Sequence, residues 1–292
     1  RAAQHIEDVI NTVPNLNYAG GTGRARFFQI RGIGELDQFV DPVNASVGVL
    51  IDNVDFSGIG SVATLFDADQ VEVLRGPQGT HYGSSALAGL IKIKTNDPED
   101  AFGTRFSLST GAYGTHTAGV VITGPVGPES GFRIAAQTHR SDGYTTNQYL
   151  GRDDVNARDE STVRAKLRWT PGEASRIDVL LMHVAIDDGY DAFSLDNTRI
   201  TLSDQPGHDR QTSNALAVDS QFQLPKFDLS LVVSLTSTDS DYDFDEDWTY
   251  VGIHPDGYSS TDNYLRDRTT RSLDARMTSN DTSLLFNGTT HW

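Results

Sequence analysis

The histidines of this chain are the first residues to test for catalytic or metal-binding chemistry. There are eight, at His5, His81, His116, His139, His183, His208, His254 and His291. None stands in the HExxH pattern of a metalloprotease, and the chain has no cysteine that could complete a zinc site. Scattered histidines of this kind indicate ordinary surface or interior residues.

The glycine- and serine-rich segment near residue 80 is the second candidate for chemistry. Gly83-Ser84-Ser85-Ala86 does not complete the GxSxG turn of a serine hydrolase. The stretch 76–83 lacks the Lys-Ser/Thr pair of a phosphate-binding loop. Because no catalytic constellation is present in the sequence, we predict that the protein is not an enzyme.

An acidic run near residue 240 is the third candidate. It contains Asp239, Asp241, Asp243, Asp245, Glu246 and Asp247. Carboxylates suit hard cations such as Ca²⁺, but the glycine and the terminal glutamate of an EF-hand loop are absent at the required spacing. The alternating aspartates continue the parity of Phe227 to Leu235, which would project them outward. We predict a solvated acidic loop, with a cation site as the alternative.

Composition excludes several classes of protein. The net charge of −17 argues against nucleic acid as a partner. The sequence has no run of 18 apolar residues that could form a transmembrane helix. The mean hydropathy is negative, yet the strands of a transmembrane barrel also keep it low, because they alternate apolar and polar residues. The chain starts at Arg1 without a signal peptide, so an exported protein would be present here as a mature form or a fragment.

Two regions of the sequence follow different patterns. Residues 1–98 mix helical spacing, from Ala2 to Val13 before Pro14, with short strands and turns. From about residue 101, strands of roughly ten residues repeat, which is the length that spans a bilayer when tilted. We expect the first region to form a compact domain against the concave face of a sheet made by the second.

The connections between the later strands alternate in length. We predict strands near 102–111, 115–124, 131–140, 160–170, 175–186, 211–223, 227–240, 264–278 and 282–292. The connections at 125–130, 171–174, 224–226 and 279–281 are short, whereas those at 141–159, 187–210 and 241–263 are long and polar. Short turns at one end and long loops at the other are typical of an outer-membrane barrel. In the strand at 160–170, we expect Val163, Ala165, Leu167 and Trp169 to face lipid, and Arg164, Lys166 and Arg168 to face the lumen.

Three segments resemble one known family in the order that the family has them. They are Phe27–Gly34 (FFQIRGIG), Val47–Val54 (VGVLIDNV) and Gln70–Gly89 (QVEVLRGPQGTHYGSSALAG). Together they closely resemble the plug domain of TonB-dependent outer-membrane receptors. The resemblance implies a mixed α+β plug domain over 1–98, without its N-terminal part, and antiparallel transmembrane β-barrel strands over 99–292. Plugged barrels of this class have 22 strands, so about nine strands imply an incomplete chain.

The same resemblance implies an energised importer in the bacterial outer membrane. A scarce ligand binds outside, between plug and loops, and the TonB complex then pulls on the plug, so that no cofactor is needed. A ferric siderophore or other metal chelate is the first expectation, and cobalamin and oligosaccharides remain open. The implied partners are the TonB energy-transducing complex, the small-molecule ligand and outer-membrane lipid.

Site residues follow from the position of the family's apical plug loops, which correspond here to 20–26, 35–43 and 56–64. We expect Arg24 and Arg26 to clamp an anionic chelate, with a solvated loop as the alternative. Gln38, Phe39 and Phe56 are expected to supply polar and apolar walls. Two further residues, Glu72 and Arg75, are expected to tie the plug to the barrel wall, and the lumen-facing Arg164, Lys166 and Arg168 to pair with plug carboxylates.

Two other functions fit parts of this sequence. One is a receptor for glycans or peptides that acts as a subunit of a larger outer-membrane assembly, which copurifying subunits would reveal. The other is a soluble β-rich carbohydrate-binding or adhesion protein, because strand alternation also occurs in soluble sandwiches. Dependence of the full-length protein on detergent separates this last function from a barrel.

Overall fold

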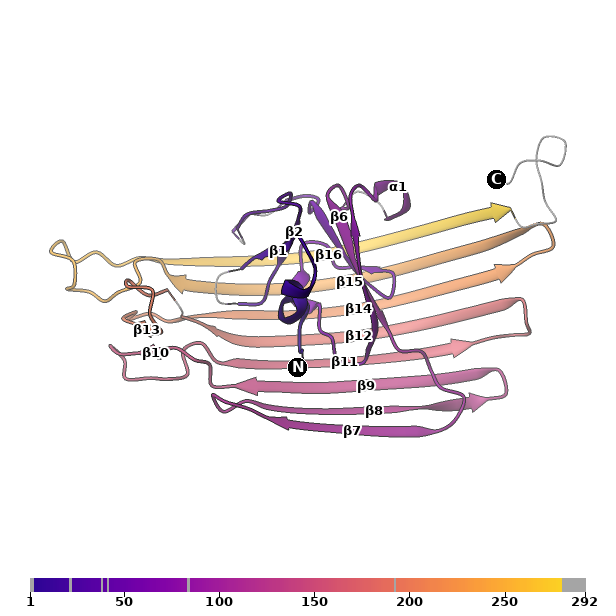
Figure 1. The fold of residues 1–292 in the computed structure, drawn as a ribbon, viewed down its shortest axis with the longest axis horizontal. Helices are drawn as coiled ribbons and strands as arrows, with labels where there is room; N and C mark the ends of the chain where they lie inside the picture. The colour runs from indigo at the N-terminus through magenta and orange to yellow at the C-terminus, as the bar shows by residue number, and fades with distance from the viewer. Residues whose placement is uncertain are drawn as a thin grey trace.

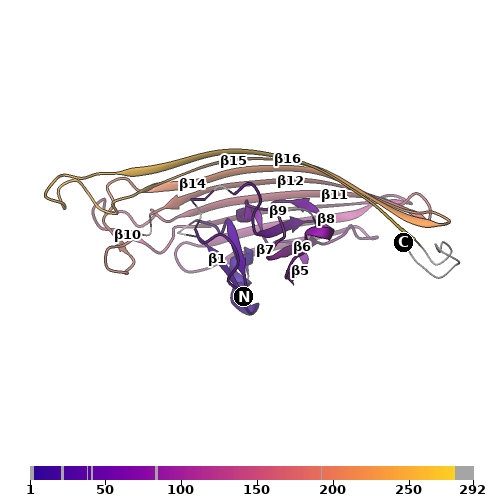
Figure 2. The ribbon, with the colours of Figure 1, turned by 90° about the horizontal axis from the view of Figure 1, so that it is seen from above.

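A curved antiparallel sheet carries a smaller mixed domain on its concave face (Figures 1 and 2). The computed structural model describes residues 3–20, 23–37, 39–40, 42–82, 85–191 and 193–279. This arrangement confirms the expected layering of the two regions. The predicted division at residue 98 falls between the last strand of the small domain and the first strand of the large sheet.

The large sheet has eight strands in the order β16-β15-β14-β12-β11-β9-β8-β7. Their bounds are β7 (Gly103–Thr110), β8 (His116–Gly127), β9 (Ser130–Ser141), β11 (Arg158–Trp169), β12 (Ser175–Tyr190), β14 (Gly207–Gln223), β15 (Phe227–Asp245) and β16 (Thr261–Ser279). Each of these strands overlaps one of the first eight predicted strands, and every neighbouring pair is antiparallel. The ninth predicted strand, 282–292, lies outside the described residues.

The two ends of the sheet differ as the sequence predicts. Tight turns join β8 to β9, β11 to β12 and β14 to β15 at one end, on the right of Figure 1. Long loops leave the other end, and two of them meet through the short parallel pair β10 (Thr146–Asn147) and β13 (Ile200–Thr201). Strand β15 runs to Asp245, farther than expected, because Tyr242 pairs in register with Tyr264 of β16 and extends the ladder. The acidic run is therefore largely strand rather than loop.

Alternation along each strand sets the two faces of the sheet. In β11, Arg164 and Lys166 are 3% and 8% exposed against the plug, whereas Val163 and Leu167 are 42% and 44% exposed on the convex side. The predicted inward and outward sides of this strand are therefore confirmed. In β15, the aspartates 239, 241 and 243 alternate with buried inward residues, as their parity predicted.

The plug domain is built on a four-stranded sheet in the order β4-β3-β6-β5. Its strands are β3 (Val47–Ile51), β4 (Val54–Asp55), β5 (Ala68–Arg75) and β6 (Gly89–Thr95), with β3 and β6 parallel. A separate hairpin joins β1 (Leu16–Ala19) to β2 (Phe27–Ile30). The expected helix near the N-terminus is the 3₁₀ helix η1 (Ile6–Thr12), η2 (Gly60–Val62) is a further 3₁₀ turn, and the short α1 (Gly79–Tyr82) follows β5.

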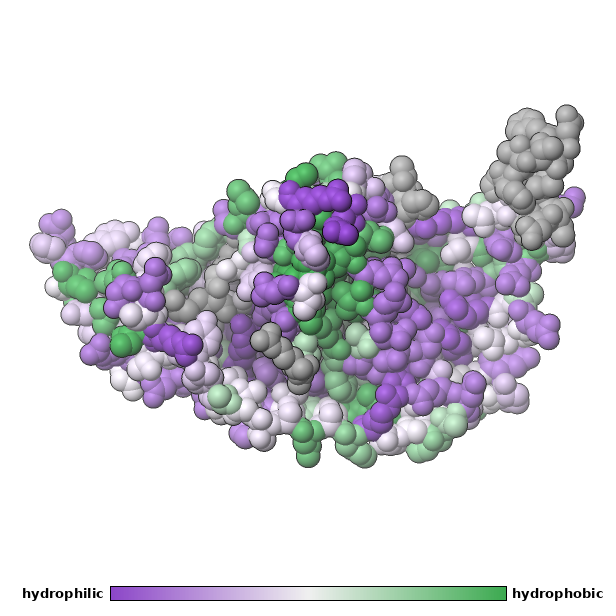
Figure 3. Space-filling model, viewed as in Figure 1, coloured by the Kyte–Doolittle hydropathy of each residue, from purple (hydrophilic) through white to green (hydrophobic). Residues whose placement is uncertain are grey.

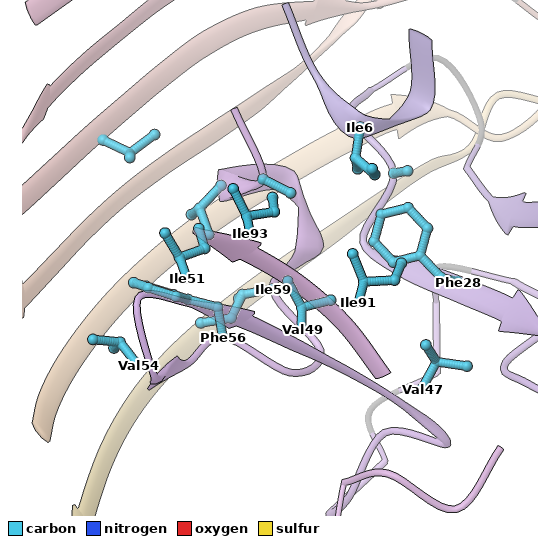
Figure 4. Packing of buried hydrophobic residues seen from close by; sticks show 14 of the residues in the cluster. Ile6, Phe28, Val47, Val49, Ile51, Val54, Phe56, Ile59, Ile91 and Ile93 are labelled. Atoms are coloured by element: carbon cyan, nitrogen blue, oxygen red, sulfur yellow. The ribbon is translucent and has the colours of Figure 1, made fainter. Parts of the chain in front are cut away.

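The apolar core of the plug extends into the wall of the large sheet. Ile6, Phe28, Val49, Ile51, Phe56, Ile91 and Ile93 are among its buried side chains (Figure 4). The same cluster includes Leu180, Met182, Val184 and Ile186 of β12 and Ala215 and Ala217 of β14. The lumen face of β12 is thus apolar where most of a barrel lumen is polar, and this stripe seats the plug. No helix in the part of the chain that the structure describes is long and apolar enough to cross a membrane.

Candidate ligand-binding and plug-anchoring site

Residues 23–26, between β1 and β2, hold the plug against the large sheet. We call these four residues the anchor segment and the large sheet the wall. The guanidinium of Arg24 donates to both carboxylate oxygens of Glu160 on β11, with Nε–Oε1 at 2.6 Å and Nη2–Oε2 at 2.9 Å. Its Nη1 donates to Glu7 of η1 at 2.5 Å. Such paired hydrogen bonds between a guanidinium and a carboxylate are among the strong polar contacts in proteins.

The second arginine of the anchor segment, Arg26, contacts β14, which is separated from β11 by β12. Arg26 Nη2 donates to Asp209 Oδ1 of β14 at 2.5 Å, and both side chains are 4% exposed. The anchor segment fits closely here, since a Cβ on Gly23 would lie 2.0 Å from Asp209 Oδ2. A side chain at position 23 would therefore displace the carboxylate to which Arg26 is bonded.

The alternative for Arg24 and Arg26, a solvated loop, is wrong. They are 4% and 3% exposed, and both are engaged by carboxylates of the wall. Their partners are 136 and 183 residues away in the sequence, so no local pattern could reveal them. Their expected role as a clamp on an anionic chelate stays a prediction.

The surroundings of Arg24 and Glu7 favour the charged forms of both side chains. Burial alone would raise the pKa of the Glu7 carboxyl, but the hydrogen bond from His5 and the charge of Arg24 hold it well below its usual range. Burial alone would lower the pKa of Arg24, but Glu160 and Glu7 raise it above its usual value. The ion pair therefore stays charged over the whole physiological range of pH.

A second set of ion pairs joins plug and wall nearer the short-turn end of the sheet. Lys166 Nζ lies 3.4 Å from Asp52 Oδ2, and Arg168 Nη2 lies 2.9 Å from Asp97 Oδ1. The pairing expected for these two wall cations is therefore confirmed. A cavity of about 250 Å³ lies beside them, and Figure 3 shows hydrophilic side chains gathered on this face next to the plug.

The third expected wall cation, Arg164, behaves differently. It is buried, yet none of its three side-chain nitrogens has a hydrogen-bond partner among the described residues. The neighbouring plug carboxylates are already engaged: Asp67 holds Arg133 through both oxygens, and Asp52 accepts from Thr95 and faces Lys166. Pairing of Arg164 with a plug carboxylate, as expected from the sequence, is wrong for this conformation.

Glu72 and Arg75 lie on β5, at the edge of the plug sheet. Glu72 is half-buried opposite Lys92 of β6, and Arg75 is exposed. Within the described ranges, neither side chain forms an ion pair or hydrogen bond with the large sheet. Their expected role in tying plug to wall stays a prediction.

An aromatic cluster lies where the plug meets the loop end of the sheet. We use this name for Phe39, Tyr190, Phe193, Tyr242, Phe244 and Tyr264. The ring of Phe39, from the plug, lies 5.3 Å from Phe244 and 5.6 Å from Tyr264. Phe39 is 36% exposed and covers Tyr242 and Phe244, which are 0% and 7% exposed. Phe39 is thus a plug residue in contact with the large sheet, and its expected role in a ligand site stays a prediction.

Two guanidinium groups approach these rings. Arg26 lies 4.3 Å from the centre of the Tyr242 ring, and Arg266 lies 5.5 Å from it and 5.4 Å from Tyr264. Arg266 Nη2 also donates to the carbonyl oxygen of Phe39 at 2.8 Å. The cluster therefore combines aromatic faces with positive charge.

Sequence reasoning missed most of this cluster, although a signal was present. Tyr242 and Phe244 alternate with Asp241 and Asp243, which is the pattern of a strand with one acidic and one aromatic face. The same alternation that marks the acidic face therefore also predicts the aromatic face. As a cation site, the segment 239–247 has no support, since no group of three or more potential metal ligands occurs in the part of the chain described.

Two expected site residues, Phe56 and Gln38, remain to be placed. Phe56 is 1% exposed and belongs to the plug core, because it follows β4 directly and packs inward, so it does not line a ligand surface. Gln38 lies outside the described residues.

Comparison with known proteins agrees with this geometry. A family model described as the TonB-dependent receptor plug domain matches residues 1–90. The pesticin receptor of Yersinia pestis is 28% identical over 166 residues, which are 55% of this chain and 24% of that protein. The ferric enterobactin receptor PirA of Pseudomonas aeruginosa is 26% identical over 164 residues, which are 50% of this chain and 22% of that protein. The chain thus spans about a quarter of the length of these curated relatives or slightly less.

Solved structures show the same fold over nearly the whole chain. The ferric yersiniabactin uptake receptor FyuA from Yersinia pestis matches with a TM-score of 0.77 at 19% identity, covering 95% of this chain and 43% of that one. The pyoverdine outer membrane receptor FpvA from Pseudomonas aeruginosa matches with a TM-score of 0.73 at 14% identity, covering 94% and 41%. Residues 1–90 therefore form a plug domain of the TonB-dependent receptor type, and the antiparallel strands that follow share the fold of the outer-membrane receptors to which the chain is similar.

Proposed function

We propose that this chain forms part of a receptor that imports a ferric siderophore, or a similar anionic metal chelate, driven by the TonB complex. The observation that carries the proposal is the aromatic cluster with Arg266 beside it. Plug and wall both contribute to this cluster. A ligand bound there would therefore contact both the plug, which rearranges during import, and the barrel strands, which do not.

The chemistry of the cluster suits a large, flat and negatively charged ligand. Exposed aromatic faces bind rings and apolar surface, and a guanidinium next to them favours an anion. Phe39 is the ring that a ligand would contact first, because it is the most exposed ring next to Tyr242 and Phe244. The names of several relatives, among them receptors for ferric enterobactin and ferric yersiniabactin, support an iron chelate as the cargo.

The ion pairs between plug and wall support a transport step that needs energy. Removing one partner of a buried ion pair leaves the other charge buried and unpaired, which is unfavourable. Pulling Arg24 and Arg26 of the plug away from Glu160 and Asp209 therefore requires work. We infer that the TonB complex supplies this work and that the binding site faces the cell exterior.

Binding measurements on the full-length receptor test the proposal. Phe39→Ala and Tyr264→Ala should each weaken binding of an anionic ferric chelate about tenfold, because each removes a ring contact from the cluster. Tyr258→Ala is the matched control, since Tyr258 is an exposed loop tyrosine. A glycan receptor would use the rings without the charge, so strong binding of a neutral oligosaccharide, unaffected by Arg266→Gln, would reject the chelate.

A further inference from the structure

Arg26 belongs to two structural features at once, the anchor segment and the border of the aromatic cluster. We propose that an anionic ligand in the aromatic cluster and the carboxylate of Asp209 compete for Arg26, so that ligand binding loosens one anchor of the plug. This inference rests on the proposed function, because it takes the aromatic cluster as the ligand site.

A single guanidinium makes both contacts. Its Nη2 is bonded to Asp209 at 2.5 Å, and its central carbon lies 4.3 Å from the centre of the Tyr242 ring. Its Nε is buried and has no hydrogen-bond partner among the described residues. Arg26 therefore keeps donor capacity for a second acceptor, whereas Arg24 uses Nε and both terminal nitrogens.

The sign of the coupling follows from charge. An anion placed against Tyr242 and Arg266 attracts Arg26 and repels the carboxylate of Asp209, and both effects weaken the ion pair. Little water separates the charges, because Arg26 and Asp209 are each 4% exposed and Tyr242 is 0% exposed. Coupling between two sites is reciprocal, so weakening the ion pair must in turn strengthen the binding of the anion.

Arg24 supplies a control within the same segment. It is anchored as firmly, to Glu160 and Glu7, but no described aromatic ring lies over its guanidinium. Breaking the Arg24 anchor should therefore loosen the plug without changing affinity for the anion. The two arginines, two residues apart, separate a general loosening of the plug from competition for Arg26.

The experiment compares Asp209→Asn with Glu160→Gln in the full-length receptor. The probes are the ferric complex of a synthetic tris-catecholamide, which is strongly anionic, and that of a synthetic tris-hydroxamate, which is uncharged. We expect Asp209→Asn to tighten binding of the anionic probe roughly fivefold or more, within the usual range of coupling between sites. Affinity for the uncharged probe should not change, and Glu160→Gln should alter neither.

A second variant reaches the same ion pair without removing a charge. Gly23→Ala places a methyl group 2.0 Å from Asp209 Oδ2, which displaces the carboxylate from Arg26. It should also tighten binding of the anionic probe. In wild type, that probe should speed hydrogen exchange of residues 23–30, as expected if it loosens the anchor.

The outcomes distinguish the two proposals. If wild type binds the anionic probe and Asp209→Asn leaves its affinity unchanged or weaker, competition for Arg26 is wrong while the proposed function stands. Equal gains in Asp209→Asn and Glu160→Gln would also overturn the competition, because plug loosening alone would then explain them. If neither probe binds wild type, the ferric-chelate function fails and the inference fails with it.

Discussion

Arg24 of the plug and Glu160 of β11 are joined by two hydrogen bonds, at 2.6 and 2.9 Å, across 136 residues of sequence. The pair lies beside the plug core and is almost fully withdrawn from water. Because the plug and the wall each contribute one charge, the stability of plug seating depends on both.

The first prediction concerns this pair. Arg24→Met should destabilise plug seating by about 3–5 kcal/mol, because buried Glu160 loses the guanidinium that binds both its oxygens and keeps, among the described residues, only the contact to Arg158, at 3.3 Å. Glu160→Gln should cost about 1–3 kcal/mol, since the amide oxygen can still accept one hydrogen bond. Calorimetry of the full-length receptor in detergent would measure both changes. An unaltered unfolding transition of the plug in Arg24→Met would contradict the anchoring role.

The second prediction compares neighbouring inward residues of β11. Arg164→Met should leave the receptor as stable as wild type or more so, because the buried guanidinium has no partner within the described residues. Lys166→Met should destabilise it by about 1.5–3 kcal/mol, since it removes the charged contacts to Asp52 and Thr95. Thermal unfolding of the two variants side by side provides the test. Equal destabilisation by both would show that Arg164 has a partner in the whole receptor.

The third prediction concerns pH. The folded-state pKa of Glu7 lies well below its usual value of about 4.3, so its contribution to stability is complete above that value. As pH falls below about 4, the unfolded state takes up the proton first, and the contribution decreases progressively until the folded-state carboxyl is protonated as well. The difference in melting temperature between wild type and Glu7→Gln should therefore narrow from pH 7 to pH 3. A constant difference over the whole range would mean that the charge of Glu7 does not matter.

The fourth prediction tests the faces of the wall. Leu167→Arg and Leu181→Arg place a charge on the convex side, where both leucines are exposed, and should each destabilise the inserted barrel by about 2–4 kcal/mol. Lumen-facing Thr162→Arg is the comparison, because its cost depends on the plug rather than on lipid. Reversible folding into lipid vesicles measures the differences. If Leu167→Arg has no cost in vesicles, that face does not meet lipid.

Strands and faces could be predicted from the sequence because their cause is local. Alternation of Val163, Leu167 and Trp169 with basic residues is enough to define both sides of β11, and short turns fix which strands are neighbours. The apolar lumen stripe of β12 was not anticipated, since Leu180 and Met182 read simply as part of an apolar strand. Their role depends on the plug, because the plug core continues into these two side chains.

Contacts between plug and wall could not be predicted, because the partners are distant in sequence. Arg24 and Arg26 follow glycines in a polar segment, which indicates an exposed loop when the wall is not in view. Arg164 and Lys166 are equivalent in the sequence pattern, since both are inward basic residues of β11. In the structure Lys166 faces Asp52, whereas Asp67 near Arg164 is already paired with Arg133. Phe39 was identified through the position of its loop, whereas Phe56, identified in the same way, belongs to the core.

The last prediction asks whether the plug must leave the wall during import. Asn53 Nδ2, on the plug, donates to Asp219 Oδ2 of β14 at 2.9 Å, and the sequence has no cysteine. In a full-length receptor freed of any other cysteine, cysteines introduced at these two positions can be joined selectively by a short, cleavable thiol reagent. Joining them should abolish uptake of a ferric chelate and leave its binding intact, because the aromatic cluster lies at the other end of the plug; cleavage should restore uptake. Each single cysteine, treated in the same way, is the control for the reagent. Normal uptake with the link in place would mean that this contact stays closed during transport and that the path opens elsewhere along the wall.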